Sequence, residues 1–200
     1  MSSLVISGDT SGTISLTVPA VAGTNTVTIP AGTGTIAVQG VSTNIVSGTA
    51  VASTSGTSID FTGIPSWVKR ITVMFNNVST NGTSIVQVQL GSGSVATSGY
   101  KSTSSYSAAL PTQYAAATTG FITETTYANA ALTRTGSYIF TLIGSNIWVG
   151  CGNMGGDQTA LVTFACAGGI TLAGTLDRVR ITTVNGTDTF DAGSINILYE

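Results

Sequence analysis

The sequence predicts an all-β protein, with an extended N-terminal β-repeat leader followed by an antiparallel β-sandwich of jelly-roll-like topology. Composition is the first indication, because the 200 residues include 25 glycines and are 42% hydrophobic but only 7% charged. Long helices normally carry charged and long side chains at 3.6-residue spacing, and no window of the sequence does so. Apolar and polar residues instead alternate with a period of two, and glycine-containing turns separate the alternating runs.

The low charge also excludes nucleic acid as a partner. Six Lys and Arg against eight Asp and Glu give a net charge of −2, which leaves no basic field for nucleic acid. No apolar run reaches about 18 residues and no basic region precedes an apolar stretch at the start, so we expect no membrane insertion and no secretion signal. Interspersed surface charge normally keeps a protein monomeric. The composition therefore favours burial of surface in a homo-oligomer or a larger assembly.

Residues 1–40 contain a short repeat. A shift of 11 residues places LTVPA at 16–20 on VTIPA at 27–31. Each unit is a short alternating strand ended by proline, and two and a half such units are too few to bury their own apolar face. We expect this leader to intertwine with its symmetry mates or to dock on another protein, and the alternative is a disordered Gly/Thr/Ser segment. The expected contact residues are Leu16, Val18, Val27, Ile29, Ile36 and Val38.

Residues 41–57 are expected to form a linker that donates a first strand near 44–51, and residues 58–200 the sandwich, with about ten strands in all. Alternating runs at 71–77 and 84–90 predict a core hairpin through Asn81-Gly82. Further hairpins are predicted around 144–146, 168–169 and 185–193. Two segments, 138–140 and 161–162, are apolar on both faces, so their strands should lie between the core and an intersubunit surface.

Aromatic residues mark the candidate contacts. Trp67, followed by Lys69 and Arg70, is expected to be a packing anchor at the joint between leader and sandwich. The segment 91–117 is poor in large apolar residues but contains tyrosines among Ser, Thr and Ala, a composition suited to contacts. Candidate ligand or intersubunit contacts are Tyr100, Tyr106, Tyr114, Tyr127 and Trp148, which is expected to point outward from its strand. The alternative for the tyrosines is that they cap the edge of the sandwich with hydrated hydroxyls.

Residues able to carry chemistry are scarce. The sequence has no histidine, which excludes the common catalytic triads and histidine metal ligands, so we expect no catalytic, cofactor-binding or metal-binding residue. An enzyme would depend on carboxylates alone, as a glycosidase can. Asp188 and Asp191 allow a calcium site or, as we favour, Asx-turn bonding in a loop. Cys151 and Cys166 are expected to be buried free thiols, because a hairpin centred on Gly155 would hold them roughly 20 Å apart.

Three blocks of sequence carry a resemblance. The leader GDTSGTISLTVPAVAGTNTVTIPAGTGTIAV, the segment SIDFTGIPSWVKRITVMFNNVSTNGTS and the closing LDRVRITTVNGTDTFDAGSINILYE resemble structural, tail-fibre-like or surface-appendage proteins of tailed bacteriophages. The resemblance implies a virion protein assembled in the bacterial host cytoplasm, with capsid or tail proteins as partners. It implies no catalytic residue.

These observations predict a non-enzymatic virion protein. We expect a homotrimeric short fibre or appendage whose leader anchors it and whose sandwich is displayed outward, where three weak contacts with a host-surface glycan would gain avidity. The alternative is a capsid decoration protein that cements neighbouring capsomers without touching the host. A carboxylate-only glycan depolymerase is a third reading.

Overall fold

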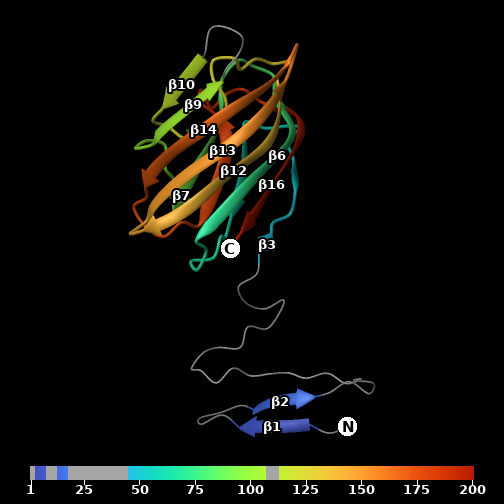
Figure 1. The fold of residues 1–200 in the computed structure, drawn as a ribbon, viewed down its shortest axis with the longest axis vertical. Coiled ribbons are helices and arrows are strands. Elements are labelled where there is room, and N and C mark those ends of the chain that lie inside the picture. The colour runs from blue at the N-terminus through green and yellow to red at the C-terminus, as the bar shows by residue number, and fades with distance from the viewer. Residues whose placement is uncertain (1–2, 8–12, 18–44, 107–112) are drawn as a thin grey trace. The chain divides into compact units, whose positions relative to one another are not determined.

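The computed structural model describes residues 3–7, 13–17, 45–106 and 113–200, and all regular structure within these ranges is β-strand (Figure 1). The chain divides into two compact units, Met1–Val38 and Gln39–Glu200. In the first unit, β1 (Ser3–Ser7) and β2 (Thr13–Thr17) pair antiparallel, with Leu4 opposite Leu16. The second unit contains two larger sheets.

The larger sheet has nine strands, and hydrogen-bonded neighbours follow the order β10-β9-β14-β13-β12-β6-β16-β3, with β4 also paired to β16. Its strands are β3 (Val46–Ser47), β4 (Val51–Ala52), β6 (Arg70–Thr80), β9 (Lys101–Tyr106), β10 (Gln113–Ala117), β12 (Thr133–Gly144), β13 (Ile147–Asp157), β14 (Leu161–Thr171) and β16 (Phe190–Tyr199).

The smaller sheet has five strands in the order β11-β7-β15-β5, with β8 paired to β7. Its strands are β5 (Ser58–Thr62), β7 (Val86–Ser92), β8 (Ser94–Val95), β11 (Phe121–Ile122) and β15 (Arg178–Thr183). All pairings between neighbours in both sheets are antiparallel, and side chains from the two sheets fill one apolar core. The predicted all-β, antiparallel sandwich is confirmed.

The predicted hairpin between 71–77 and 84–90 is wrong, because β6 lies in the nine-stranded sheet and β7 in the five-stranded sheet. The same holds for the predicted hairpin of β15 and β16. Since β6 pairs with β16 and β7 pairs with β15, a two-stranded ribbon passes from one sheet to the other, as in jelly rolls. Its two crossing loops are bonded together, with the amide of Asn81 donating to the carbonyl of Thr189 at 2.9 Å.

Strands β12, β13 and β14 form a three-stranded meander (Figure 1). The predicted turn at 144–146 is confirmed, and Ser145 and Asn146 adopt the positive φ angles, 48° and 61°, that a tight hairpin requires. The predicted turn at Gly168-Gly169 is wrong, because β14 continues through both glycines. Gly168 is needed there for packing, since a Cβ atom would lie 2.9 Å from Cδ1 of Phe121.

Aromatic rings fill the core under this meander. Tyr138 and Phe140 stack with centroids 4.7 Å apart and planes 3° apart. Their rings lie against backbone, because a Cβ atom on Gly150 would come within 2.6 Å of the Phe140 ring. Phe121, from the opposite sheet, packs on Phe140 at 4.8 Å. The glycines of β13 thus let large rings approach the sheet closely.

Residues 45–57 of the expected linker belong to the sandwich. The first strand expected near 44–51 consists of two short strands, β3 and β4, which pair with β16. Buried Ser53 fastens the segment, because its amide donates to Gly193 O at 3.0 Å and its hydroxyl donates to Ala192 O at 2.7 Å.

Candidate interaction surfaces

Most of the predicted leader contacts lie outside the described residues. Only Leu16 falls in a described strand, at a register position opposite Leu4. Val18, Val27, Ile29, Ile36 and Val38 lie in the undescribed segment 18–44. The role of the leader stays a prediction.

The predicted joint packs on the end of the chain. Trp67 is 50% exposed, with its ring 5.9 Å from that of Tyr199, so it packs on the sandwich without being fully buried. The amides of Lys69 and Arg70 donate to Glu200 O at 2.7 and 2.8 Å, and the Arg70 guanidinium pairs with the Glu200 carboxylate. These bonds fix residues 67–70 against the last residues of β16.

The tyrosines separate into two groups. Tyr100 and Tyr106 are buried, so neither ring is available to a ligand and their expected surface contact is wrong. The hydroxyl of Tyr100 accepts from Leu90 N at 2.8 Å and lies 3.0 Å from Ala96 O, and burial raises its pKa above the ordinary value. Tyr127 is half-buried against Tyr106. Tyr114 is 78% exposed on β10, so it alone of the four offers an open ring.

The expected outward direction of Trp148 is also wrong. Its side chain is 2% exposed, whereas Ile147 and Val149 on either side are 38% and 39% exposed. Side chains along this strand do alternate between the core and the outer face, but the residues expected inside lie outside and the reverse. The larger indole ring occupies the core, and the aliphatic side chains lie on the outer face of the sheet.

The outer face of the meander β12-β13-β14 exposes aliphatic side chains and carries little charge. Exposed aliphatic side chains gather on the meander: Ile139, Ile143, Ile147, Val149 and Leu161. Strands β12, β13 and β14 contain only two charged residues, Arg134 and Asp157. Arg134 is buried on the inner side, and Asp157 is the last residue of β13.

The outer face of the five-stranded sheet is polar. Arg180 of β15 pairs with Asp60 of β5 at 2.7 Å, and Gln89 of β7 lies on the other side of Arg180. Gln87 and Gln89 are buried under a loop that contains Thr119. The Thr119 hydroxyl donates to Gln87 Oε1 at 2.9 Å, and the Thr119 carbonyl accepts from Gln89 Nε2 at 2.8 Å. A hollow of about 300 Å³ lies over this face, between these residues and Asn185.

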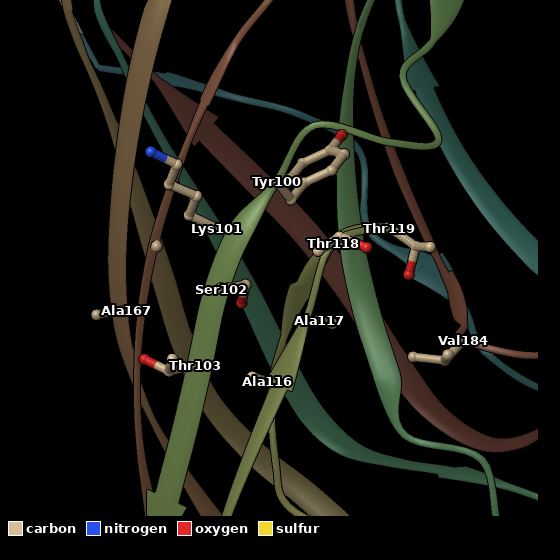
Figure 2. A pocket seen from close by; sticks show the side chains of 11 residues that line it. Tyr100, Lys101, Ser102, Thr103, Ala116, Ala117, Thr118, Thr119, Ala167 and Val184 are labelled. Carbon is tan, nitrogen blue, oxygen red and sulfur yellow. The ribbon is translucent and has the colours of Figure 1, made fainter.

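A second hollow, of about 650 Å³, lies beside β9 and β10. Figure 2 shows its lining: the Lys101 ammonium points away from the side where Thr118, Thr119 and Val184 lie. The remaining side chains there are mainly alanine, serine and threonine. Its polar groups do not converge on one point, so the hollow has the size but not the chemistry of a typical small-molecule site.

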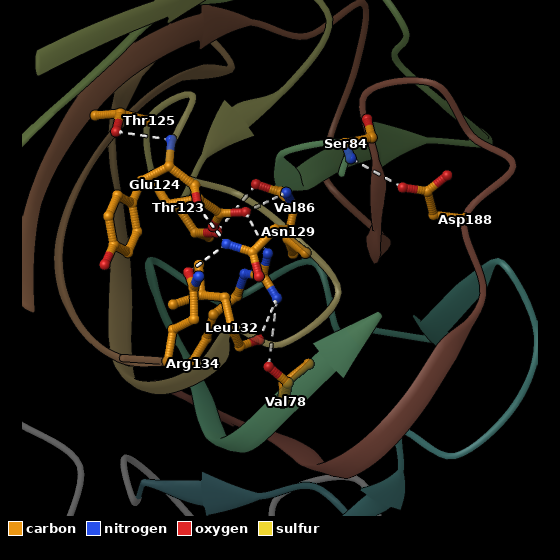
Figure 3. A network of polar contacts seen from close by, with 12 residues as sticks. Val78, Ser84, Val86, Thr123, Glu124, Thr125, Asn129, Leu132, Arg134 and Asp188 are labelled. Atoms are coloured by element: carbon orange, nitrogen blue, oxygen red, sulfur yellow. Dashed lines mark hydrogen bonds and ion pairs between the residues drawn. The ribbon is translucent and has the colours of Figure 1, made fainter. Parts of the chain in front are cut away.

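A fully buried ion pair lies inside the sandwich (Figure 3). The Arg134 guanidinium is 2.8 Å from the Glu124 carboxylate, and both side chains are 0% exposed. Glu124 also accepts the amide of Val86 at 2.7 Å, and Arg134 donates to Leu132 O at 3.1 Å. The pair joins the loop after β11 to the start of β12. With no exposure to solvent or to either hollow, its role is structural.

The two cysteines lie close in register but on opposite faces. Cys166 is opposite Gly152, next to Cys151, because the turn between β13 and β14 falls after Asp157 and not at Gly155 as expected. Both are free; Cys166 is buried as expected, but the expected burial of Cys151 is wrong. Burial raises the pKa of Cys166 to about 12, so this thiol stays protonated and unreactive near neutral pH.

The carboxylates of the loop 184–191 bind the protein itself. Asp188 accepts from Ser84 N at 2.9 Å (Figure 3) and from Asn185 Nδ2 at 2.7 Å. The Asx-turn bond expected of Asp188 or Asp191 is made by Asn185 instead, whose Oδ1 accepts the amide of Thr187 at 3.0 Å. The described ranges contain no cluster of three or more residues able to hold a metal ion.

The ion pairs at the start of β15 lie within the chain. Arg178 pairs with Asp177 at 2.7 Å, and this hydrogen bond lowers the pKa of Asp177 below its usual value. In the part of the chain that the structure describes, no helix could cross a membrane. No family description, curated protein or solved structure matches the sequence or the fold.

Proposed function

We propose that the protein is a non-enzymatic structural component of a tailed-phage virion, forming a short homotrimeric fibre or appendage. The leader attaches it to the particle, and the sandwich is displayed outward for contact with a host-surface glycan. The sequence resemblance supports the virion assignment. The observation that carries the structural role is the apolar outer face of the meander, because exposed apolar surface of this kind marks interaction sites.

A structural role also agrees with the chemistry of the chain. The sequence lacks histidine, and the reactive groups in the described interior serve packing. Glu124 is paired with Arg134, and Cys166 has a raised pKa. A carboxylate-only glycan depolymerase remains the enzymatic competitor, and unchanged molecular weight of host polysaccharide after incubation with the protein would eliminate it.

The alternative is a capsid decoration protein that cements neighbouring capsomers. Two observations favour this reading: the exposed aliphatic residues on the outer face of the meander, and the hollow beside β9 whose polar groups do not converge on a ligand. In this reading the sandwich lies against other virion proteins, and no host contact is made.

Deleting the gene from the phage genome tests these proposals. Intact particles with lost infectivity would support host contact, whereas particles that burst more easily on heating would support cementing. Mass spectrometry of purified wild-type particles is the control. Absence of the protein from those particles would contradict both roles.

A further inference from the structure

We propose that the outer face of β12, β13 and β14, with flanking β6 and β9, is the surface through which one copy of this chain packs on another. The inference deepens the proposed function by locating its self-association, and it rests on the oligomeric part of that proposal alone. The rest of the argument concerns the charge, shape and size of this face.

A row of side chains crosses the face at its middle. Register pairs Thr72 with Ile139, Ile139 with Cys151, Cys151 with Ala167, and Ala167 with Thr103. These residues are small or aliphatic, and four of the five are exposed while Thr72 is partly buried. None carries a charge at neutral pH. Short side chains across five neighbouring strands leave a surface with little relief, which a second sheet can approach closely at about 10 Å.

The absence of charge from the middle of this face favours a second copy as the occupant. In a contact between identical faces near a symmetry axis, a charge meets the same charge on its partner, which costs energy. A face built for a different protein can carry charges matched by opposite ones. The proposed surface carries charge only at the ends of strands: Asp157 ends β13, Arg70 begins β6 and Lys101 begins β9. The opposite sheet tolerates Arg180 on its surface because Asp60 lies beside it.

The face is large enough for a stable contact. Strands β6, β12, β13 and β14 have 11, 12, 11 and 11 residues, and β9 adds 6. At about 3.3 Å per residue and about 4.8 Å between strands, they cover roughly 800 Å². Specific complexes bury about 800 Å² per partner. One sheet face thus supplies the area of a standard interface.

Light scattering on the full chain tests the surface. Cys151→Asp places a charge at the middle of the face, where it would meet its own copies. Cys151→Ser is the neutral control at the same position, and Thr62→Asp puts the same charge on the exposed outer face of β5. We expect the wild type and both controls to form oligomers, with a mass well above the 20.1 kDa of one chain. Cys151→Asp should lower the mass to that of one chain.

The outcomes separate this inference from the proposed function. A monomeric wild type, an unchanged mass of Cys151→Asp, or equal dissociation by Thr62→Asp would overturn the surface. A dimer split only by Cys151→Asp would support the surface and reject the trimer. Absence of the protein from virions would refute the proposed function and leave the surface standing. Far-UV circular dichroism checks folding, and Ala167→Asp, exposed on β14, replaces Cys151→Asp if that variant misfolds.

Discussion

The outer side of β15 is charged, whereas the outer side of the meander carries almost no charge. Strand β15 has six residues and carries Arg178 and Arg180 on its outer side, each paired with a carboxylate of the same chain. The meander of β12, β13 and β14 has one arginine, Arg134, and turns it inward to Glu124. Charged side chains that form ion pairs within their own chain are typical of a face exposed to solvent. An uncharged face with exposed aliphatic residues suits contact with protein.

The largest expected effect concerns the inward arginine. Arg134→Met leaves the Glu124 carboxylate buried without its partner, and we expect a loss of about 3 to 5 kcal/mol in the free energy of unfolding. Urea denaturation measures it. Adding Glu124→Leu should restore much of the stability, because the unpaired charge is removed. A loss below about 1 kcal/mol for Arg134→Met alone would mean that the pair does not join the loop to β12 as described.

A smaller effect is expected from two glycine substitutions, one on the inner side and one on the outer side of the meander. Gly150→Ala forces a methyl group to within 2.6 Å of the Phe140 ring, so we expect a loss of about 1 to 3 kcal/mol. Gly169→Ala is the matched control on the outer side, where the nearest atom is 3.5 Å away and no loss is expected. Thermal unfolding of both variants measures the difference. Equal destabilisation would contradict the assigned inner and outer sides.

The smallest effect concerns the charged face of the smaller sheet. Asp60→Asn removes one partner of an ion pair whose side chains are 36% and 38% exposed, and solvent screening limits the loss to below about 1 kcal/mol. The oligomer mass should stay that of the wild type, since this face is turned to water. A variant that changes the mass would show that the smaller sheet also takes part in assembly.

Sequence alternation located most strands but not their partners. Runs at 71–77 and 84–90 are β6 and β7, yet the turn residues between them connect two sheets instead of closing a hairpin. A loop of five residues allows either connection, and local sequence does not distinguish them. Gly168-Gly169 was expected to be a turn for the same local reason. Gly168 instead lets the Lys101 carbonyl and the Phe121 ring come close, and both contacts are with distant parts of the chain.

The predicted contact residues were wrong where consecutive residues of a strand are all apolar, because alternation then does not show which side faces the core. Ile147, Trp148 and Val149 allow either side to face the core, and the structure buries the larger ring. Trp67 was expected to be a packing anchor, and it packs on Tyr199 but stays half exposed. What the sequence did indicate was the doubly apolar character of 138–140 and 161–162. Ile139 and Leu161 from those segments lie exposed on the outer face of the meander.

Thiol labelling of the native chain tests self-association through this face most directly. Cys151 is exposed at its middle, while Cys166 is buried with a pKa raised to about 12 and serves as the unreactive internal reference at pH 8. The labelling rate constant of Cys151 should fall as chain concentration and the scattering mass rise together. A rate constant that stays unchanged while the mass increases would contradict the account, because the outer face would then remain open in the oligomer.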